Sequence, residues 1–161
     1  MKKIICYLDS EHYSNALFSI FDDIELEDKI FAEMVQEYEM SLEDIKTVFC
    51  YDKKEDCEIY FMCIDNRFSL YQILTIDSED EYACIWHHCY NGVDFEIRKT
   101  GTYDECIDFM KKDAKEVQEQ VQGCQMDEWP RQIILDTGNE WEVWDITYIG
   151  NRAKDEKMLL N

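Results

Sequence analysis

The chain has 161 residues, of which 46% are hydrophobic and 14% aromatic, so it can bury a sizeable core and is expected to fold as one domain. Its 37 Asp and Glu residues outnumber its 16 Lys and Arg residues, which gives a formal net charge of -21 at pH 7. This charge excludes ordinary binding to nucleic-acid phosphates and disfavours anionic membrane surfaces, and no apolar run approaches the roughly 20 residues that span a bilayer.

The first 44 residues predict a strand followed by helices. Residues 4–8 form a short apolar run that is typical of a strand. After Ser10, apolar side chains recur at helical spacing up to Phe21, which predicts a first helix. The Ser10 hydroxyl can cap the start of this helix. Ser41 opens a motif similar to a capping box, which predicts a short helical turn. Between them lies the clearest helical stripe in the chain, which consists of Leu26, Ile30, Met34 and Tyr38.

From Thr47 to Thr100 the apolar period changes to two and predicts an antiparallel meander. Turn-forming residues separate several segments that are rich in β-branched and aromatic side chains. Asp65-Asn66 and Asn91-Gly92 are signals for tight hairpin turns. The predicted strands are residues 47–51, 58–64, 68–76, 82–90 and 93–99.

The last third predicts a long helix and a hairpin. The helix is expected to start at Thr102 or Asp104 and to run to about residue 122, with Gly123 as its stop. Residues 133–135 and 140–149 then form a hairpin across the turn at 136–139.

Grouped strands with helices before and after them imply an α+β fold. We expect one antiparallel sheet of about six to eight strands, with two N-terminal helices and one long helix before the C-terminal hairpin. A single proline and five glycines argue against a linker, so residues 1–150 are expected to form one domain and residues 151–161 a flexible tail. Several strands are apolar on both faces, which indicates burial on both sides or an aromatic patch for a partner and leaves a homodimer open.

The N-terminus and the cysteines predict an intracellular protein. The apolar run at residues 4–8 is too short for a secretory signal. The eight cysteines are scattered through hydrophobic segments, so they are expected to be buried thiols and not disulfides.

The densest cluster of metal-ligand and nucleophile types is Cys-Ile-Trp-His-His-Cys at residues 84–89. On a strand, His87 and Cys89 point to the same face about 6.6 Å apart and can supply two zinc ligands. A nucleophilic dyad of His88 and Cys89 is disfavoured because adjacent strand residues point to opposite faces. A zinc- or thiol-dependent enzyme centred on His87, His88 and Cys89 is therefore only an alternative. We expect no catalytic residue, no resident metal and no cofactor.

Acidic residues are concentrated in two blocks. Between Asp22 and Asp44 ten acids accompany a single base, Lys29. Glu33 and Glu37 are an i,i+4 pair on the predicted helix, so their carboxylates stand about one turn apart. Residues 77–81 form a second block in one loop with no base. Such acidity serves solubility, or it forms an ordered surface that attracts a groove lined by Lys and Arg.

In its size, in these acidic blocks and in its lack of a catalytic signature, the chain resembles small acidic inhibitors that phages and mobile elements carry against host nucleases. These include anti-restriction DNA mimics and some anti-CRISPR proteins, and the chain is also similar to immunity proteins of toxin nucleases. The resemblance implies a stoichiometric inhibitor that binds the basic nucleic-acid-binding surface of a nuclease in the bacterial cytoplasm. The residues expected at that interface are Asp22, Asp23, Glu25, Asp28, Glu33, Glu37, Asp77, Glu79, Asp80 and Glu81, with Trp129 and Trp144 as aromatic anchors.

Overall fold

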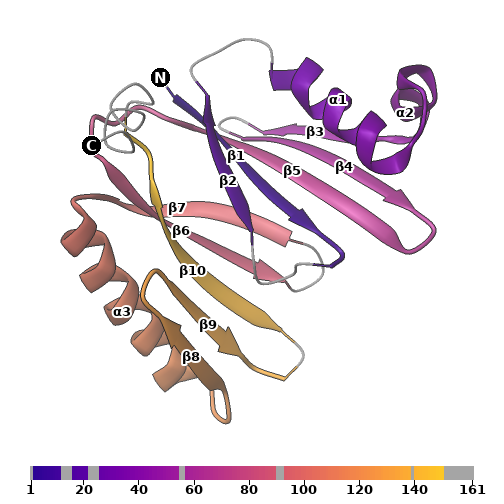
Figure 1. The fold of residues 1–161 in the computed structure, drawn as a ribbon. Coiled ribbons are helices and arrows are strands. Elements are labelled where there is room, and N and C mark those ends of the chain that lie inside the picture. Colours follow the sequence, from indigo (N-terminus) through magenta and orange to yellow (C-terminus); the bar gives the residue numbers. More distant parts are fainter. Residues whose placement is uncertain are drawn as a thin grey trace. The chain divides into compact units, whose positions relative to one another are not determined.

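The computed structural model of the chain describes residues 2–11, 16–21, 26–54, 57–89, 93–138 and 140–150. These residues divide into two compact units, Met1–Asp77 and Ser78–Asn161 (Figure 1). Each unit contains one five-stranded sheet, and all neighbouring strands in both sheets are antiparallel. The predicted α+β class is therefore confirmed, with ten strands in two sheets and three helices in the described residues.

The N-terminal unit is a sheet in the order β2-β1-β5-β4-β3 with two helices. Strands β3, β4 and β5 form the first part of the predicted meander. The Asp65-Asn66 turn between β4 and β5 has both residues at positive φ, 50° and 68°, as a tight two-residue hairpin requires. The elements are β1 Lys2–Asp9, β2 Leu17–Phe21, α1 Leu26–Tyr38, α2 Leu42–Val48, β3 Cys50–Lys54, β4 Cys57–Ile64 and β5 Arg67–Ile76.

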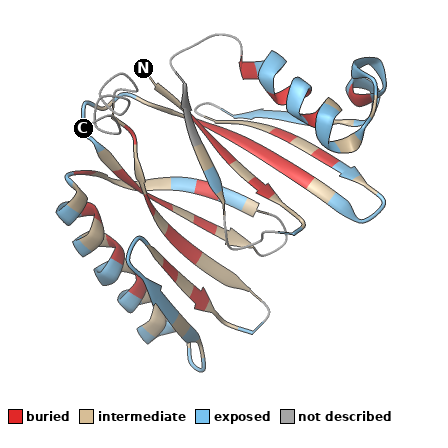
Figure 2. Ribbon diagram, in the orientation of Figure 1, coloured by how far each residue is buried: buried red, intermediate tan, exposed pale blue. Residues whose placement is uncertain are grey.

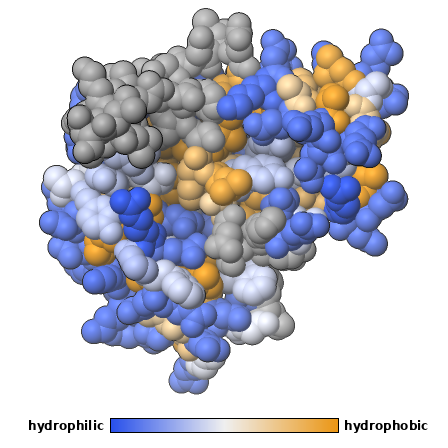
Figure 3. Space-filling view, in the orientation of Figure 1, coloured by the Kyte–Doolittle hydropathy of each residue, from blue (hydrophilic) through white to orange (hydrophobic). Residues whose placement is uncertain are grey.

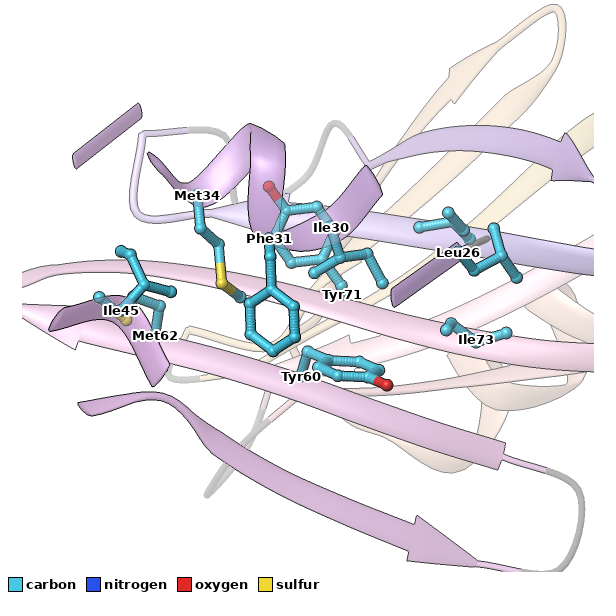
Figure 4. Close-up of a cluster of buried hydrophobic side chains, with 10 residues drawn as sticks. Leu26, Ile30, Phe31, Met34, Ile45, Tyr60, Met62, Tyr71 and Ile73 are labelled. Atoms are coloured by element: carbon cyan, nitrogen blue, oxygen red, sulfur yellow. The ribbon is translucent and has the colours of Figure 1, made fainter. Parts of the chain in front are cut away.

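Helix α1 packs on the sheet through the apolar stripe that the sequence predicts. Phe31 and Met34 point from the helix toward the sheet, and the Tyr60 ring lies against Phe31 (Figure 4). The Phe31 and Tyr60 rings meet edge to face with their centroids 6.0 Å apart. Full burial of each such side chain contributes about 1.5–3 kcal/mol, so the amphipathic pattern fixes which face of α1 turns outward. Helix α2 adds buried Ile45, and Ser41 caps it by accepting the Asp44 N–H.

The helix predicted from Ser10 to Phe21 is wrong. Residues 17–21 are an edge strand that pairs antiparallel with β1 from Tyr7↔Leu17 to Lys3↔Phe21. Ser10 joins β1 to β5 instead of capping a helix, because its N–H donates to the Phe68 carbonyl at 3.1 Å and its hydroxyl accepts from the Phe68 N–H. The apolar spacing suits either structure over so short a segment, and pairing with β1 decides between them.

The C-terminal unit is a sheet in the order β7-β6-β10-β9-β8 with one long helix. Thr102 caps α3 by accepting the Glu105 N–H. The helix buries Cys106, Met110 and Ala114 in a cluster with residues of β6, β9 and β10, and its outer face is exposed (Figure 2). The elements are β6 Tyr82–Cys89, β7 Val93–Gly101, α3 Tyr103–Gln120, β8 Gln125–Trp129, β9 Gln132–Asp136 and β10 Trp141–Tyr148.

Three further expectations need correction. The meander is divided, because β3 to β5 belong to one sheet and β6 and β7 to the other. Strand β8 was not predicted; its sequence Gln-Met-Asp-Glu-Trp is polar, and it forms by pairing along β9. All eight cysteines are free, as expected, but Cys50 and Cys63 are exposed and not buried.

Each unit has a hydrophobic cluster of its own, whereas a chain of this length is expected to form a single core. The single domain over residues 1–150 stays a prediction. The Asn91-Gly92 turn and the tail at residues 151–161 lie outside the described residues. Within the described ranges, no helix has both the length and the apolar character needed to cross a membrane.

Candidate functional site

Helix α1 presents a row of exposed carboxylates. Burial of Leu26, Ile30, Phe31 and Met34 against the sheet turns the opposite face outward. Glu33 and Glu37 are both exposed and lie one helical turn apart, as the sequence predicts. They are not on the face opposite Leu26 and Ile30, because they flank the buried stripe on the side that borders the sheet. In Figure 3 hydrophilic residues predominate over the region of α1 and α2, with small hydrophobic patches between them. The acidic row is therefore an accessible surface of the N-terminal unit.

A cavity of about 350 Å³ lies between this row and the sheet. Strand β1 contributes Ile5 and Tyr7, β5 contributes Tyr71, and the edge strand β2 contributes Leu17, which is 65% exposed. The helix side of the cavity consists of Lys29, Glu33, Gln36 and Glu37. The two predicted glutamates thus form one wall of a concave site whose opposite wall is aromatic and apolar.

The aromatic wall is a pair of tyrosines on neighbouring strands. Tyr7 and Tyr71 are direct cross-strand partners, and their ring centroids lie 4.9 Å apart with the planes tilted by 48°. The Tyr7 hydroxyl donates to Asp9 Oδ2 at 2.9 Å, and Tyr71 lines the cavity together with Glu33. Burial raises the pKa of both tyrosines above the usual value. Both hydroxyls therefore stay protonated at neutral pH.

Glu37 is held by a cation of the chain itself. The Arg67 Nη2 atom lies 2.8 Å from Glu37 Oε1, and both side chains are half exposed. The Arg67 guanidinium also lies over the Tyr38 ring, 5.3 Å from its centroid. An exposed pair of this kind contributes at most about 1 kcal/mol. Glu37 therefore remains within reach of a competing cation, although its charge is partly neutralised.

The other acids predicted for the interface are not in this cavity. Asp28 is exposed in the first turn of α1 and lines a separate groove with α2 residues Leu42 and Lys46. Asp22, Asp23 and Glu25 lie outside the described residues.

The loop at residues 77–81 connects β5 to β6 and is exposed at Asp77, Glu79, Asp80 and Glu81. Part of its acidity is used locally, because Asp80 Oδ2 accepts hydrogen bonds from Thr100 Oγ1 at 2.7 Å and from Ser78 Oγ at 3.1 Å. The Glu81 carbonyl accepts the Ile149 N–H at 2.7 Å. These contacts give the loop a structural role in the C-terminal unit.

The two tryptophans predicted as anchors differ. Trp129 is 61% exposed at the end of β8, as an anchor needs to be. Trp144 is fully buried, so the expectation that it is an exposed anchor is wrong. It lies on β10, between β6 and β9, with its side chain in the cluster beneath α3. Its indole N–H donates to Asp113 Oδ2 at 2.9 Å, so the core also satisfies its polar atom.

The cysteine and histidine cluster offers little chemistry. His87 is fully buried, and its ring lies against Phe95 with the centroids 4.7 Å apart. The half-buried ring of His88 stacks on Trp86 at 5.0 Å. Burial raises the pKa of the Cys89 thiol, which disfavours the thiolate that a nucleophile or zinc ligand needs. No group of three or more His, Cys, Asp or Glu residues with a geometry for a metal ion occurs in the described part of the chain.

Two features of the units were missed by sequence reasoning. The pairing of Tyr7 with Tyr71 depends on the register of β1 with β5, which local periodicity does not reveal. The network around Trp144 also includes Arg98, which lies at an irregularity between β6 and β7 at Cys84 and Ile85. The register passes over Arg98 there, and the Arg98 guanidinium reaches Asp113 at 2.8 Å. The alternation of residues along a strand indicates the sheet face on which each side chain lies. Which side chains are adjacent on that face depends on how the strands pair.

Comparisons of the chain with protein-family models, with curated proteins and with solved structures found no match.

Proposed function

We propose that the chain is a stoichiometric inhibitor that binds the basic nucleic-acid-binding surface of a nuclease through the acidic face of α1. The observation that carries the proposal is the exposed pair Glu33 and Glu37 on one wall of a concave, tyrosine-lined site. The proposed setting is the cytoplasm of a bacterial cell, and the proposed role is that of the anti-CRISPR and anti-restriction inhibitors that the sequence resembles. The chain itself binds no nucleic acid and needs no cofactor for this role.

The charge of the whole chain supports a basic partner. Residues 1–77 hold 18 acidic and 7 basic residues, and residues 78–161 hold 19 and 9, so both units are strongly negative. A field of this sign raises the rate of encounter with a surface rich in Lys and Arg. It also repels competing nucleic acid, so a bound inhibitor keeps the substrate away by charge as well as by bulk.

A capture experiment tests the proposal. The immobilised protein is incubated with bacterial lysate at about 50 mM and about 300 mM salt, and retained proteins are identified by mass spectrometry. The expected result is a basic nuclease that is retained at low salt, released at high salt, and inhibited by an equimolar amount of the protein in a cleavage assay.

A matched pair of variants places the interface. The double variant Glu33→Gln/Glu37→Gln removes two charges from α1, and Glu116→Gln/Glu119→Gln removes two from exposed positions of α3. Capture and inhibition are expected to weaken with the α1 variant and to persist with the α3 variant. Equal loss in both variants would indicate a general charge effect and would contradict the assigned surface.

A further inference from the structure

The cavity under α1 combines aromatic, acidic and apolar walls, which is the composition that recognises a planar cation. We propose that it is a site for one guanidinium group, the side chain of a single arginine of the partner. This inference rests on the proposed function, because a nucleic-acid-binding surface supplies the arginine. It adds the chemical identity of the group that enters the site.

The tyrosine pair provides an aromatic surface for a guanidinium, mainly through the half-buried Tyr7 ring, because Tyr71 is only 3% exposed. Tyr7 and Tyr71 lie side by side on β1 and β5, and both line the cavity. An arginine head group gains from cation–π and stacking contacts with such rings, more so when water is partly excluded. Glu33 lines the same cavity and places a carboxylate near the tyrosine pair. Ring and carboxylate are thus placed for one cation before it arrives.

The carboxylates provide acceptors in a pattern that suits a fork of N–H donors. Glu33 and Glu37 follow each other along one wall, one helical turn apart. Carboxylates accept paired N–H bonds from arginine, and these charge-assisted bonds are stronger than neutral ones. The ammonium group of lysine is a compact charge that lacks both the flat surface for stacking and the paired N–H donors of a guanidinium.

The chain already uses the same recognition next to the cavity. Arg67 donates to Glu37 at 2.8 Å while its guanidinium lies over the Tyr38 ring. Tyr7 and Glu33 give the cavity a second combination of a tyrosine and a glutamate, one from the sheet and one from the helix. An arginine that enters the cavity would therefore make the same kind of contact as Arg67 makes with Glu37 and Tyr38.

The size and the rim of the cavity also suit an arginine side chain. Its volume of about 350 Å³ lies at the lower end of the range for ligand pockets, about 300–1,000 Å³. Ile5 and the exposed Leu17 give apolar surface for the aliphatic stem. Lys29 is the one basic residue in the described lining, and its positive charge opposes the entry of a second cation. Removal of that charge should strengthen binding.

A small probe tests the site without the partner. The full-length protein, labelled with ¹⁵N, is titrated with N-acetyl-arginine methylamide and followed by heteronuclear NMR. Shifts are expected at Tyr7, Glu33, Gln36 and Tyr71. The matching citrulline compound, which has the same shape but no charge, should cause none of these shifts, and the lysine compound should bind more weakly.

Variants assign the binding energy to the cavity. Glu33→Gln is expected to lower the association constant of the arginine probe about fivefold, and Lys29→Gln to raise it by about twofold to fivefold. Glu43→Gln, which removes an exposed charge from α2 outside the cavity, is the matched control and should change little. The spectrum of each free variant reports whether its fold is intact.

Equal binding of the citrulline or lysine compound, or unchanged binding in Glu33→Gln, would overturn the arginine site. None of these results bears on whether a basic nuclease is captured and inhibited, because that assay measures the whole acidic surface. Conversely, selective binding of the arginine probe by a protein that captures no nuclease would leave the site standing and would remove the proposed function.

Discussion

The Nδ1 atom of His87 lies 4.0 Å from Oδ2 of Asp145, and the two side chains are only 0% and 13% exposed. The contact arises because β6 and β10 are neighbours: His87 is paired with Val143, so Asp145 occupies the diagonal position on the same face. Burial raises the pKa of Asp145 from its ordinary value of 3.8 to about 7, although a hydrogen bond with Gln132 acts in the opposite direction. The charged carboxylate is therefore disfavoured in the folded protein.

This pKa predicts a specific pH dependence of stability. A carboxyl group with a higher pKa in the folded than in the unfolded state favours folding when it is protonated, and this contribution is lost as the pH rises from about 4 to about 7. Across that window Asp145 alone should lower the free energy of unfolding by up to about 1.4 kcal/mol per pH unit. Asp145→Asn is expected to remove this slope.

Urea unfolding of both proteins at several pH values between about 4 and about 8 measures the effect. Asp127→Asn, at an exposed position of β8, serves as the control that should keep the slope of the parent protein. Parallel curves for the parent protein and Asp145→Asn would show that the raised pKa is absent.

Substitution by phenylalanine is expected to change the free energy of unfolding by different amounts at the two tryptophans. Trp144→Phe removes an indole N–H that donates to Asp113 at 2.9 Å, and it leaves a gap in the core of the C-terminal unit. We expect a loss of about 2–4 kcal/mol in the free energy of unfolding. Trp129→Phe, at a site that is 61% exposed, should change it by less than about 0.5 kcal/mol. Denaturant unfolding compares the two, and a similar cost for both would contradict the assigned burial.

The Thr102 cap at the start of α3 is expected to contribute to the stability of the protein. Thr102 accepts the Glu105 N–H at 3.2 Å, and its hydroxyl donates to Glu105 Oε1 at 3.2 Å. Thr102→Ala should cost about 1 kcal/mol of stability, because the first turn loses this cap. Thr102→Ser keeps the hydroxyl and should restore most of it. Thermal unfolding followed by circular dichroism distinguishes them; an alanine variant as stable as the serine variant would remove the cap from the account.

Local patterns were sufficient for some elements and not for others. The stripe from Leu26 to Tyr38 is long enough to define α1, and Asp65-Asn66 defines its turn through backbone conformation alone. Residues 17–21 and 125–129 are five-residue edge strands that exist by pairing with β1 and β9. Their own sequences do not determine a strand conformation, because the hydrogen bonds that stabilise it come from the partner strand.

The candidate site shows the same division. Helical periodicity places Glu33 and Glu37 on one exposed face, and the structure confirms that placement. The cavity beside them depends on the antiparallel register of β1 with β5, which brings Tyr7 next to Tyr71. The sequence does not show that Trp129 is exposed and Trp144 buried. Their exposure depends on the positions of their strands, since β8 lies at the edge of its sheet and β10 lies in the interior.

In the proposed function, the α1 carboxylates recognise a basic surface of the nuclease. The most direct measurement is the association rate constant of the protein with the captured nuclease, by surface plasmon resonance at about 50 mM and about 300 mM salt. We expect an association rate constant that falls steeply with salt, and a smaller rate constant for Glu33→Gln/Glu37→Gln than for the α3 double variant. A rate that ignores salt, and that is the same for both double variants, would contradict the proposed function.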